Sequence, residues 1–376
     1  MQVQPFKFGV ATSDEYFTDR VEETKRLVSN FENNINTILI SPRRWGKTSL
    51  VKKAISKIDS EAIKVVFLDI FACRTEGEFC NMFATAVLKQ TSSKWQEWVR
   101  NAQEFLARVS PRITLGTDPT TDISFSIDLK DKTVGIEETL QLPEKIAQRS
   151  NCRIVVCIDE FQQIGEFTDA LIFQKKLRAI WQHQTSVSYC LFGSKKHLMS
   201  ELFGRKDYPF YKFGDTIYLE KIGTADWVAY IRERFTSTGK EVSETIAEQI
   251  CRSVDNHSSY VQQLSWLVWG HTTDIATERE LDLALQDIID QNGPLFEKQI
   301  EDLTAYQLSF LRAIVDGVEE SFASQEVIDK YNLSSSSNVA AIKTALVKKE
   351  LIDIEKGKVV VTDPVLPLWM KRYLRP

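Results

Sequence analysis

The sequence lacks the short motifs that usually hold metal ions in proteins. Its cysteines form no C-x-x-C pair, and its histidines show neither H-x-x-x-H nor H-E-x-x-H spacing. Zinc sites of the common kinds are therefore not expected. Most of the cysteines lie in apolar runs, which is typical of reduced thiols in a reducing compartment. These residues are Cys73, Cys80, Cys152, Cys157, Cys190 and Cys251, with His183, His197, His257 and His271.

Long hydrophobic runs and a strong charge of one sign are also missing. No stretch approaches the ~18 apolar residues that span a bilayer, and the N-terminal MQVQPFKFGVATSDEYF has neither an apolar signal core nor a basic leader. We therefore expect a cytoplasmic protein without a membrane partner. The net charge of -5 argues against a uniformly basic nucleic-acid binder. A length of 376 residues, 43% of them hydrophobic, predicts a globular protein of two or three domains.

Short apolar runs alternate with helical patterns in the first part of the chain. They are INTILI, IKVVFLDIF, CRIVVCIDE, VSYCLFGS and DTIYLEKI. Strands buried on both faces need such continuous Val- and Ile-rich runs, so residues 1–222 are predicted to form an α/β domain with a parallel sheet. Alternating apolar residues around turn residues at about 110–132 predict an inserted β-hairpin. It would form either a surface ribbon over the core or a partner-binding element.

The remaining chain changes its pattern twice. Residues 223–302 contain helical patterns that begin with Ser, Thr or Asp, with no strand-like run between them, which predicts a helical lid domain. Residues 303–376 contain three helical patterns and then two β runs around EKGK, the order of a winged helix.

A winged helix that reads DNA should present a basic stripe to the phosphates. Residues 303–376 hold ten Lys and Arg against nine Asp and Glu. The third helical pattern has only Lys343, Lys348 and Lys349 as basic residues. DNA is therefore a weaker expectation here than a protein partner or an intramolecular contact.

The stretch ILISPRRWGKTSL resembles a phosphate-binding (Walker A) loop, G-x-x-x-x-G-K-[ST], with Ser41 in place of the first glycine. An apolar strand precedes it and apolar residues at helical spacing follow, so the loop's amides should face an anion at a helix N-terminus. Gly46 would let phosphate approach, Lys47 would reach the β- and γ-phosphates, and the Thr48 hydroxyl would bind Mg²⁺. The expected nucleotide contacts are Arg43, Arg44, Trp45, Gly46, Lys47, Thr48 and Ser49.

A second motif, IVVCIDE, ends a buried strand with two carboxylates. Ligands of parallel α/β sheets bind at this edge, beyond the carboxyl ends of the strands. Asp159 is placed to hold hydrated Mg²⁺, as in a Walker B motif, and Glu160 to orient or deprotonate the water that attacks the γ-phosphate. An acidic pair at this place can also cap a helix, but its combination with the loop that carries Lys47 favours a nucleotide site.

These two motifs resemble the archaeal-type ATPases within the AAA+ and signal-transducing (STAND) P-loop NTPases, especially a bacterial branch with SPRRWGKTSL and IDEFQ. The resemblance continues through YFTDR, YCLFGS, LFGRKDYPFYKFG, SSYVQQL and DPVLPLW, over nearly the whole chain. It implies ATP or ADP with Mg²⁺, slow ATP hydrolysis and use of the nucleotide as a molecular switch. The alternatives are an ATP-gated DNA-binding regulator and a protein-binding adaptor with structural nucleotide.

The resemblance also implies roles for residues outside the two motifs. Phe17 and Arg20 would lie near the nucleotide base, although a core position for Phe17 and a surface ion pair for Arg20 fit as well. Ser194 falls where the family has its first sensor of the γ-phosphate; a helix cap is the alternative. Arg205 would act on the γ-phosphate of a neighbouring subunit, which requires self-assembly; a local ion pair is the alternative. The second-sensor region has no arginine, and His257 is its nearest substitute.

Overall fold

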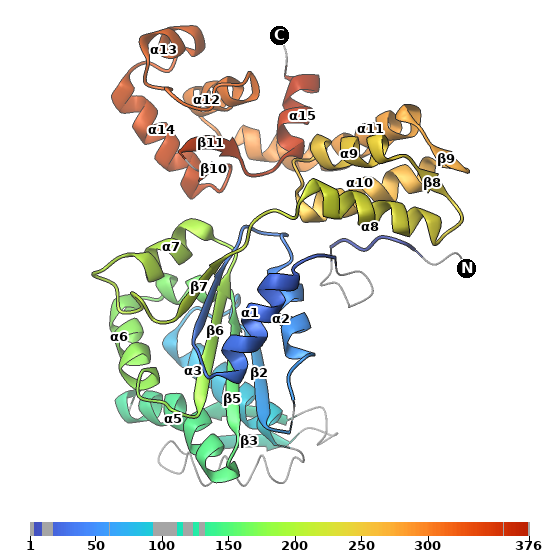
Figure 1. Cartoon of the computed structure of the whole chain (residues 1–376). Coiled ribbons are helices and arrows are strands. Elements are labelled where there is room, and N and C mark those ends of the chain that lie inside the picture. The colour runs from blue at the N-terminus through green and yellow to red at the C-terminus, as the bar shows by residue number, and fades with distance from the viewer. Residues whose placement is uncertain are drawn as a thin grey trace. The chain divides into compact units, whose positions relative to one another are not determined.

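The structure is a computed structural model, and the chain divides into two compact units that we describe separately (Figure 1). The sheet unit is Ser13–Glu220, and the helical unit is Met1–Thr12 with Lys221–Pro376. The residues that the structure describes are 4–9, 18–59, 61–92, 111–115, 123–127, 132–355 and 357–374.

A five-stranded parallel sheet forms the centre of the sheet unit, in the order β2-β5-β6-β1-β7. The apolar runs of the sequence form these strands, so the predicted α/β fold is confirmed. Within the sheet, β6 lies between β5 and β1, which brings the carboxyl ends of these three strands together. The strands are β1 (Thr37–Ile40), β2 (Ile63–Asp69), β5 (Arg153–Asp159), β6 (Val187–Gly193) and β7 (Asp215–Tyr218).

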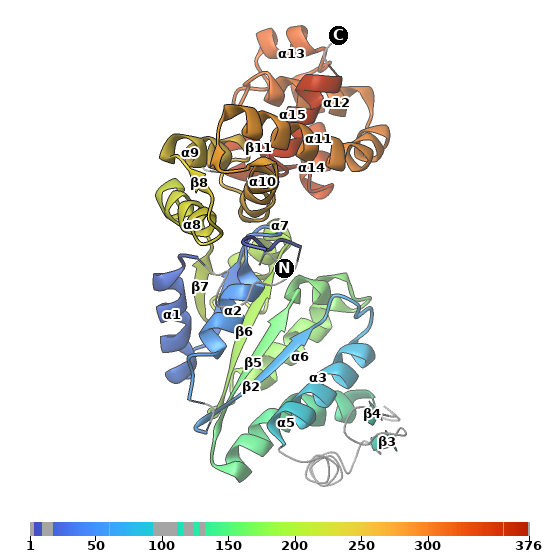
Figure 2. The ribbon, with the colours of Figure 1, turned by 90° about the vertical axis from the view of Figure 1, so that its right-hand side faces the viewer.

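Helices cover both faces of this sheet (Figure 2). On one face lie α1 (Val21–Glu32) and α2 (Lys47–Ile55), and Leu39 belongs to their core cluster. Ile38 and Ile40 point to the opposite face and its separate cluster. Because both faces are buried, the strands need apolar residues at successive positions. The helices of the second face are α3 (Glu76–Thr91), α5 (Lys132–Ser150), α6 (Ala170–Trp181) and α7 (Lys196–Gly204).

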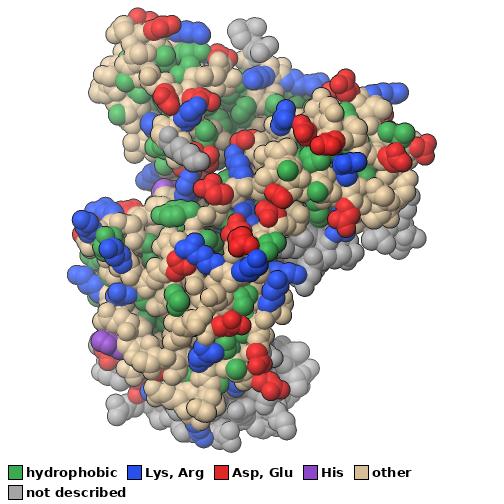
Figure 3. All heavy atoms as spheres, viewed as in Figure 1, with side chains coloured by type: hydrophobic (Ala, Val, Ile, Leu, Met, Phe, Trp, Pro, Cys, Tyr) green, Lys and Arg blue, Asp and Glu red, His purple; other side chains and the backbone are tan. Residues whose placement is uncertain are grey.

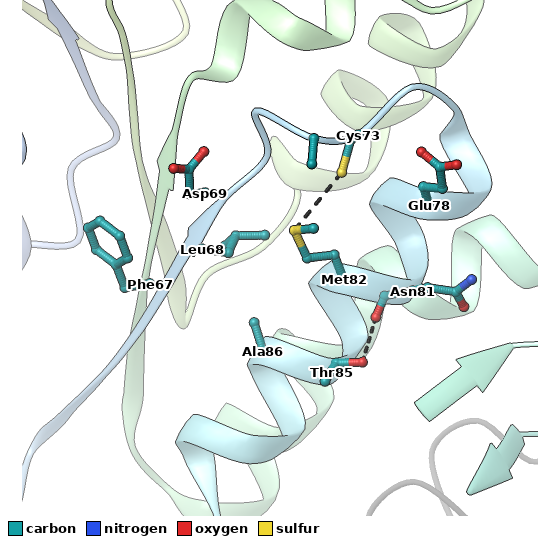
Figure 4. A pocket seen from close by; sticks show the side chains of 10 residues that line it. Phe67, Leu68, Asp69, Cys73, Glu78, Asn81, Met82, Thr85 and Ala86 are labelled. Carbon is teal, nitrogen blue, oxygen red and sulfur yellow. Dashed lines mark hydrogen bonds between the residues drawn. The ribbon is translucent and has the colours of Figure 1, made fainter. Parts of the chain in front are cut away.

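Three further features lie beside this sheet or at its edge. The strands β3 (Pro111–Leu115) and β4 (Ile123–Ile127) form a separate antiparallel pair. At the edge strand β2, the Gln90 side chain accepts a hydrogen bond from the Phe67 amide and donates one to the Phe67 carbonyl, both at 2.9 Å. A hollow opens between β2 and α3 (Figure 4), lined by Phe67, Leu68, Asp69, Ala72, Cys73, Glu78, Asn81, Met82, Thr85 and Ala86.

The helical unit begins with helices whose first residues follow polar caps. Ser243 and Thr277 accept hydrogen bonds at the starts of α9 and α11. The sequence predicts no strand between these helices, and that detail is wrong, because two short strands pair in parallel there. The elements are α8 (Thr224–Thr236), β8 (Glu241–Val242), α9 (Glu244–Ser253), α10 (Ser258–His271), β9 (Ile275–Ala276) and α11 (Glu278–Glu301).

The C-terminal part of this unit has the element order of a winged helix. Three helices precede an antiparallel hairpin, and a final helix packs against α11 through Trp369, whose ring centroid lies 6.0 Å from that of Phe296. The division into a lid and a winged-helix domain stays a prediction, since one core cluster spans both segments. The elements are α12 (Ala305–Val315), α13 (Gln325–Tyr331), α14 (Ser336–Lys348), β10 (Ile352–Glu355), β11 (Lys358–Val361) and α15 (Val365–Tyr373).

Candidate functional site

The loop between β1 and α2 explains why its first position tolerates serine. Ser41 is fully buried, its hydroxyl donates to the Pro42 carbonyl at 3.0 Å, and its φ is negative. Gly46 instead has a φ of 89°, in the left-handed region that glycine adopts at little cost. A Cβ built on Gly46 would have no protein atom within 4 Å, so the space beside it is open. The second glycine of the pattern is therefore required by the backbone, and the first is not.

The rest of the loop is anchored on one side and open on the other. Trp45 is buried in the core cluster below α1 and α2, whereas Arg43 and Arg44 are exposed. The helix α2 begins at Lys47, and its N-cap residue Gly46 has no side chain to bond the first-turn amides. These donors and the helix dipole favour an anion at this position.

Lys47 joins this loop to the end of β5. Its ammonium nitrogen lies 3.0 Å from Glu160 Oε1 and 3.6 Å from Asp159 Oδ1. The three side chains are only 10%, 15% and 8% exposed. Buried charges need such pairing because desolvation is costly. An ammonium has three donors, so Lys47 can keep a carboxylate while it binds a phosphate oxygen.

Thr48 and Asp159 form a pair of hard oxygen donors. The Thr48 hydroxyl donates to Asp159 Oδ2 at 2.8 Å. Burial raises the pKa of Asp159, while Lys47 and the Thr48 hydrogen bond oppose that rise. Hard oxygen donors fit Mg²⁺, which keeps waters and substrate phosphates as its other ligands. The described residues contain no group of three or more His, Cys, Asp or Glu that could hold a metal ion.

Glu160 is held from several directions. It follows β5 with φ 55° and ψ 38°, a left-handed conformation that is rare for a non-glycine residue. Its Oε2 accepts hydrogen bonds from Ser194 Oγ at 2.8 Å and from Gln162 Nε2 at 2.5 Å. Burial alone would raise the pKa of Glu160, but Lys47, Gln162 and Ser194 outweigh it and lower that pKa. The carboxylate form is therefore favoured.

Comparison with known proteins agrees with this arrangement. Residues 17–213 match a family described as an ATPase domain predominantly from Archaea, which covers more than half of the chain. The chain belongs to this ATPase-domain family. Residues 294–372 match a probable winged helix domain. No protein among the curated ones matches the sequence.

Solved structures share the fold of this ATPase-domain chain at low sequence identity. The Walker-type ATPase of Pyrococcus abyssi is 17% identical with a TM-score of 0.69, and the match covers 98% of this chain and 99% of that one. The ORC2 protein of Aeropyrum pernix is 13% identical with a TM-score of 0.59, over 98% of this chain and 99% of that one. No helix in the described part of the chain could span a membrane, since none is both long and apolar enough.

The structure places the predicted residues of this ATPase-domain chain in two groups. Lys47, Thr48, Asp159, Glu160 and Ser194 form one connected cluster at the ends of β1, β5 and β6. The second group is Arg20 and Arg205, whose ion pairs are with carboxylates outside this cluster. Ser49 is buried in the first turn of α2, and Phe17 lies outside the described residues.

Arg20 is buried and lies just before α1. It has a φ of 64°, and its Nη1 pairs with Glu23 Oε1 at 3.0 Å. Its buried Nη2 has no hydrogen-bond partner within the described residues. The ion pair that was the alternative expectation for Arg20 is thus present, but the Arg20 side chain is buried and does not lie at the surface.

Arg205 forms a local ion pair. Its guanidinium is exposed, lies 2.7 Å from Asp207 and 3.1 Å from Glu201, and sits 4.9 Å from the centre of the Tyr208 ring. These contacts match the alternative given for this residue, and a role on a neighbouring subunit stays a prediction. Arg205 and Gln162 line one cavity of about 330 Å³ between the segment Phe161–Glu166 (η3), α6 and α7.

Sequence reasoning misses Gln162. It stands in the quoted IDEFQ motif, but neither periodicity nor spacing predicts that its amide turns back to Glu160. The contact depends on the left-handed backbone at Glu160 and the 3-10 segment that follows. A partial signal was nevertheless available, because Gln162 is a polar residue only two positions after Glu160.

Proposed function

We propose that the protein binds ATP with Mg²⁺, hydrolyses it slowly to ADP and phosphate, and uses the bound nucleotide as a conformational switch. The observation that carries this proposal is the contact of Lys47 with both Asp159 and Glu160 at the carboxyl edge of the sheet. Membership of an ATPase-domain family supports it. The Aeropyrum pernix ORC2 structure, which shares the fold, holds ADPNP and ADP.

The phosphates would bind at the start of α2. The first-turn amides and Lys47 supply donors and positive charge, and the left-handed Gly46 leaves open space for the approach. Thr48 and Asp159 would hold the metal ion together with waters and phosphate oxygens. Bound Mg²⁺ supplies charge that neutralises the phosphate oxygens during phosphoryl transfer.

Glu160 would act on the attacking water. As the water oxygen bonds to the γ-phosphorus, the bond to the β–γ bridging oxygen breaks, ADP leaves, and the water proton passes to the Glu160 carboxylate. The lowered pKa keeps Glu160 ionised and able to accept that proton. Ser194, which donates to Glu160, is the candidate residue for sensing the γ-phosphate.

The decisive experiment compares binding with turnover. We expect Glu160→Gln to retain ATP affinity within about threefold and to lose turnover by about 100-fold or more. Lys47→Ala should remove detectable nucleotide binding. EDTA should abolish hydrolysis by the wild-type chain, and added Mg²⁺ should restore it. Binding is measured by calorimetry and turnover by phosphate release.

Glu166→Gln is the matched control, because Glu166 lies in the segment that follows Glu160 but its carboxylate pairs with Lys195 at 3.0 Å and accepts a hydrogen bond from Gln163. Its turnover should equal that of the wild type. Undiminished hydrolysis by Glu160→Gln would remove Glu160 from its role. Tightly retained ADP without turnover would instead favour the adaptor with structural nucleotide. Equal hydrogen exchange in the ATP and ADP states would contradict the switch.

The winged-helix match supports nucleotide-gated DNA contact as a second function. Lys348 and Lys349 are exposed at the end of α14. On the face shown in Figure 3, however, basic and acidic side chains are mixed over the helical unit, and a DNA-binding face should be predominantly basic. Salt-dependent duplex binding that weakens when Lys343, Lys348 and Lys349 are changed to Ala would support this function.

A further inference from the structure

Gln162 and Ser194 both donate hydrogen bonds to the same oxygen of Glu160, Oε2. A carboxylate has about four acceptor positions, two on each oxygen. Oε2 accepts from both Gln162 and Ser194, whereas Oε1 accepts from Lys47 alone among the described residues. The remaining acceptor position therefore lies on Oε1, the oxygen that faces Lys47.

Gly193 makes the approach of Gln162 possible. It is the last residue of β6, and a Cβ built there would lie 1.8 Å from Gln162 Oε1. Its φ lies outside the left-handed region, so the backbone would accept any residue. A glycine inside a strand often marks a close approach of another group, and the approaching group here is the Gln162 amide.

Packing alone does not account for a glutamine at this position. Gln162 is 2% exposed, and its Oε1 has no hydrogen-bond partner in the described part of the chain. An unpaired buried carbonyl costs free energy, whereas an apolar side chain of similar length would not carry that cost. What the glutamine adds is the hydrogen bond from Nε2 to Glu160.

We propose that Gln162 is a positioning residue for ATP hydrolysis. It fixes the Glu160 carboxylate so that Oε1 receives the proton of the attacking water, and Gly193 leaves the room that the amide needs. This inference rests on the ATPase function proposed above. It assigns Gln162 an effect on the rate of the chemical step and none on nucleotide binding.

The test uses the full chain and four variants: Gln162→Met, Gln162→Ala, Gly193→Ala and the double variant Gln162→Ala with Gly193→Ala. Methionine keeps the volume of glutamine without its donor. Both Gln162 variants should lower kcat by about 10- to 100-fold, as expected for a misplaced catalytic group, with ATP affinity within about threefold of the wild type. Gln163→Ala, at the neighbouring position where the amide bonds Glu166, is the control and should leave kcat unchanged.

Gly193→Ala should lower kcat to a similar degree, because its methyl group displaces the Gln162 amide. In the Gln162→Ala background the same methyl group should change kcat by less than about twofold, since the amide is gone. Circular dichroism shows that each variant is folded, and the Gln162 variants test the role even if Gly193→Ala does not fold.

The outcomes separate this inference from the function on which it rests. If the wild-type chain hydrolyses ATP and Gln162→Met has the same kcat, the positioning role is overturned and the ATPase function stands. A normal kcat for Gln162→Met beside a low one for Gln162→Ala shows that only packing matters and also overturns it. A wild-type chain that binds ATP without turnover overturns both proposals.

Discussion

The two units of the chain bury different kinds of side chain. Among the described residues, the buried charged side chains are Arg20, Lys47 and Asp159, and all three lie in the sheet unit. The buried polar residues of the helical unit include no Asp, Glu, Lys or Arg among the described residues; they are His257, Gln262, Ser265 and Thr272. Several exposed polar residues of this unit cap helices, as Thr304 does in the capping box of α12.

This difference separates features that serve stability from features that serve chemistry. Buried charge and left-handed non-glycine backbone both cost free energy, and at Glu160 the backbone strain lies beside the buried pair of Lys47 and Asp159. Caps and apolar contacts in the helical unit lower the free energy of the folded chain. Substitutions in the helical unit should therefore change stability alone, whereas those at the Lys47 cluster should also change ATP binding or turnover.

The largest loss of stability should come from the helical unit. Trp369→Ala removes a buried ring that packs between Phe296 and Tyr373, and we expect the free energy of unfolding of this unit to fall by about 4 kcal/mol. Hydrogen exchange of residues 278–301 under increasing urea measures it. ATP affinity should not change, since every residue of the Lys47 cluster lies in the sheet unit. Tyr306→Ala, at an exposed aromatic of α12, is the control.

Lys47→Met should have a smaller cost in the sheet unit, about 3 kcal/mol in the free energy of unfolding at neutral pH. It leaves Asp159 and Glu160 buried without their cation. Adding Asp159→Asn and Glu160→Gln should recover most of that loss while ATP binding stays absent. Urea denaturation followed by circular dichroism compares the two variants. A triple variant that is no more stable than Lys47→Met would contradict the view that unpaired charge causes the loss.

Thr304→Ala should have the smallest effect, about 1 kcal/mol in the free energy of unfolding, because α12 loses its N-cap. Thermal unfolding by calorimetry measures the change, and Thr304→Ser should restore most of it because serine supplies the same hydroxyl. ATP turnover should be unaffected. A cap variant that slows turnover would break the separation between the two units.

The sequence was sufficient for the five strands of the parallel sheet and for the edge at which the candidate site residues lie. Continuous Val and Ile runs identify strands buried on both faces, and the loop before Lys47 identifies the edge where the site forms. Because β5 ends at Asp159 and α2 begins at Lys47, a parallel sheet places both residues at the same edge, and the strand order then decides that they meet. The confirmed fold and family rest on these patterns.

Other features depend on contacts that no local pattern contains. The order of the strands places β6 between β5 and β1, and only this order brings Ser194 to Glu160. The pairing of β8 with β9 joins segments of two residues each, too short to show an alternation of apolar residues. The contact between Gln162 and Gly193 likewise requires knowing how the chain turns after Glu160.

The two hydrogen bonds between the Gln90 side chain and the Phe67 backbone bear on how the sheet could meet other molecules at high concentration. Strand β2 is an edge strand, and exposed edges can pair with strands of other molecules and start aggregation. The amide of Gln90 presents one donor and one acceptor to the backbone of Phe67, as a neighbouring strand would. A single side chain from α3 thus satisfies one donor and one acceptor of this strand edge, which an incoming strand would otherwise bond.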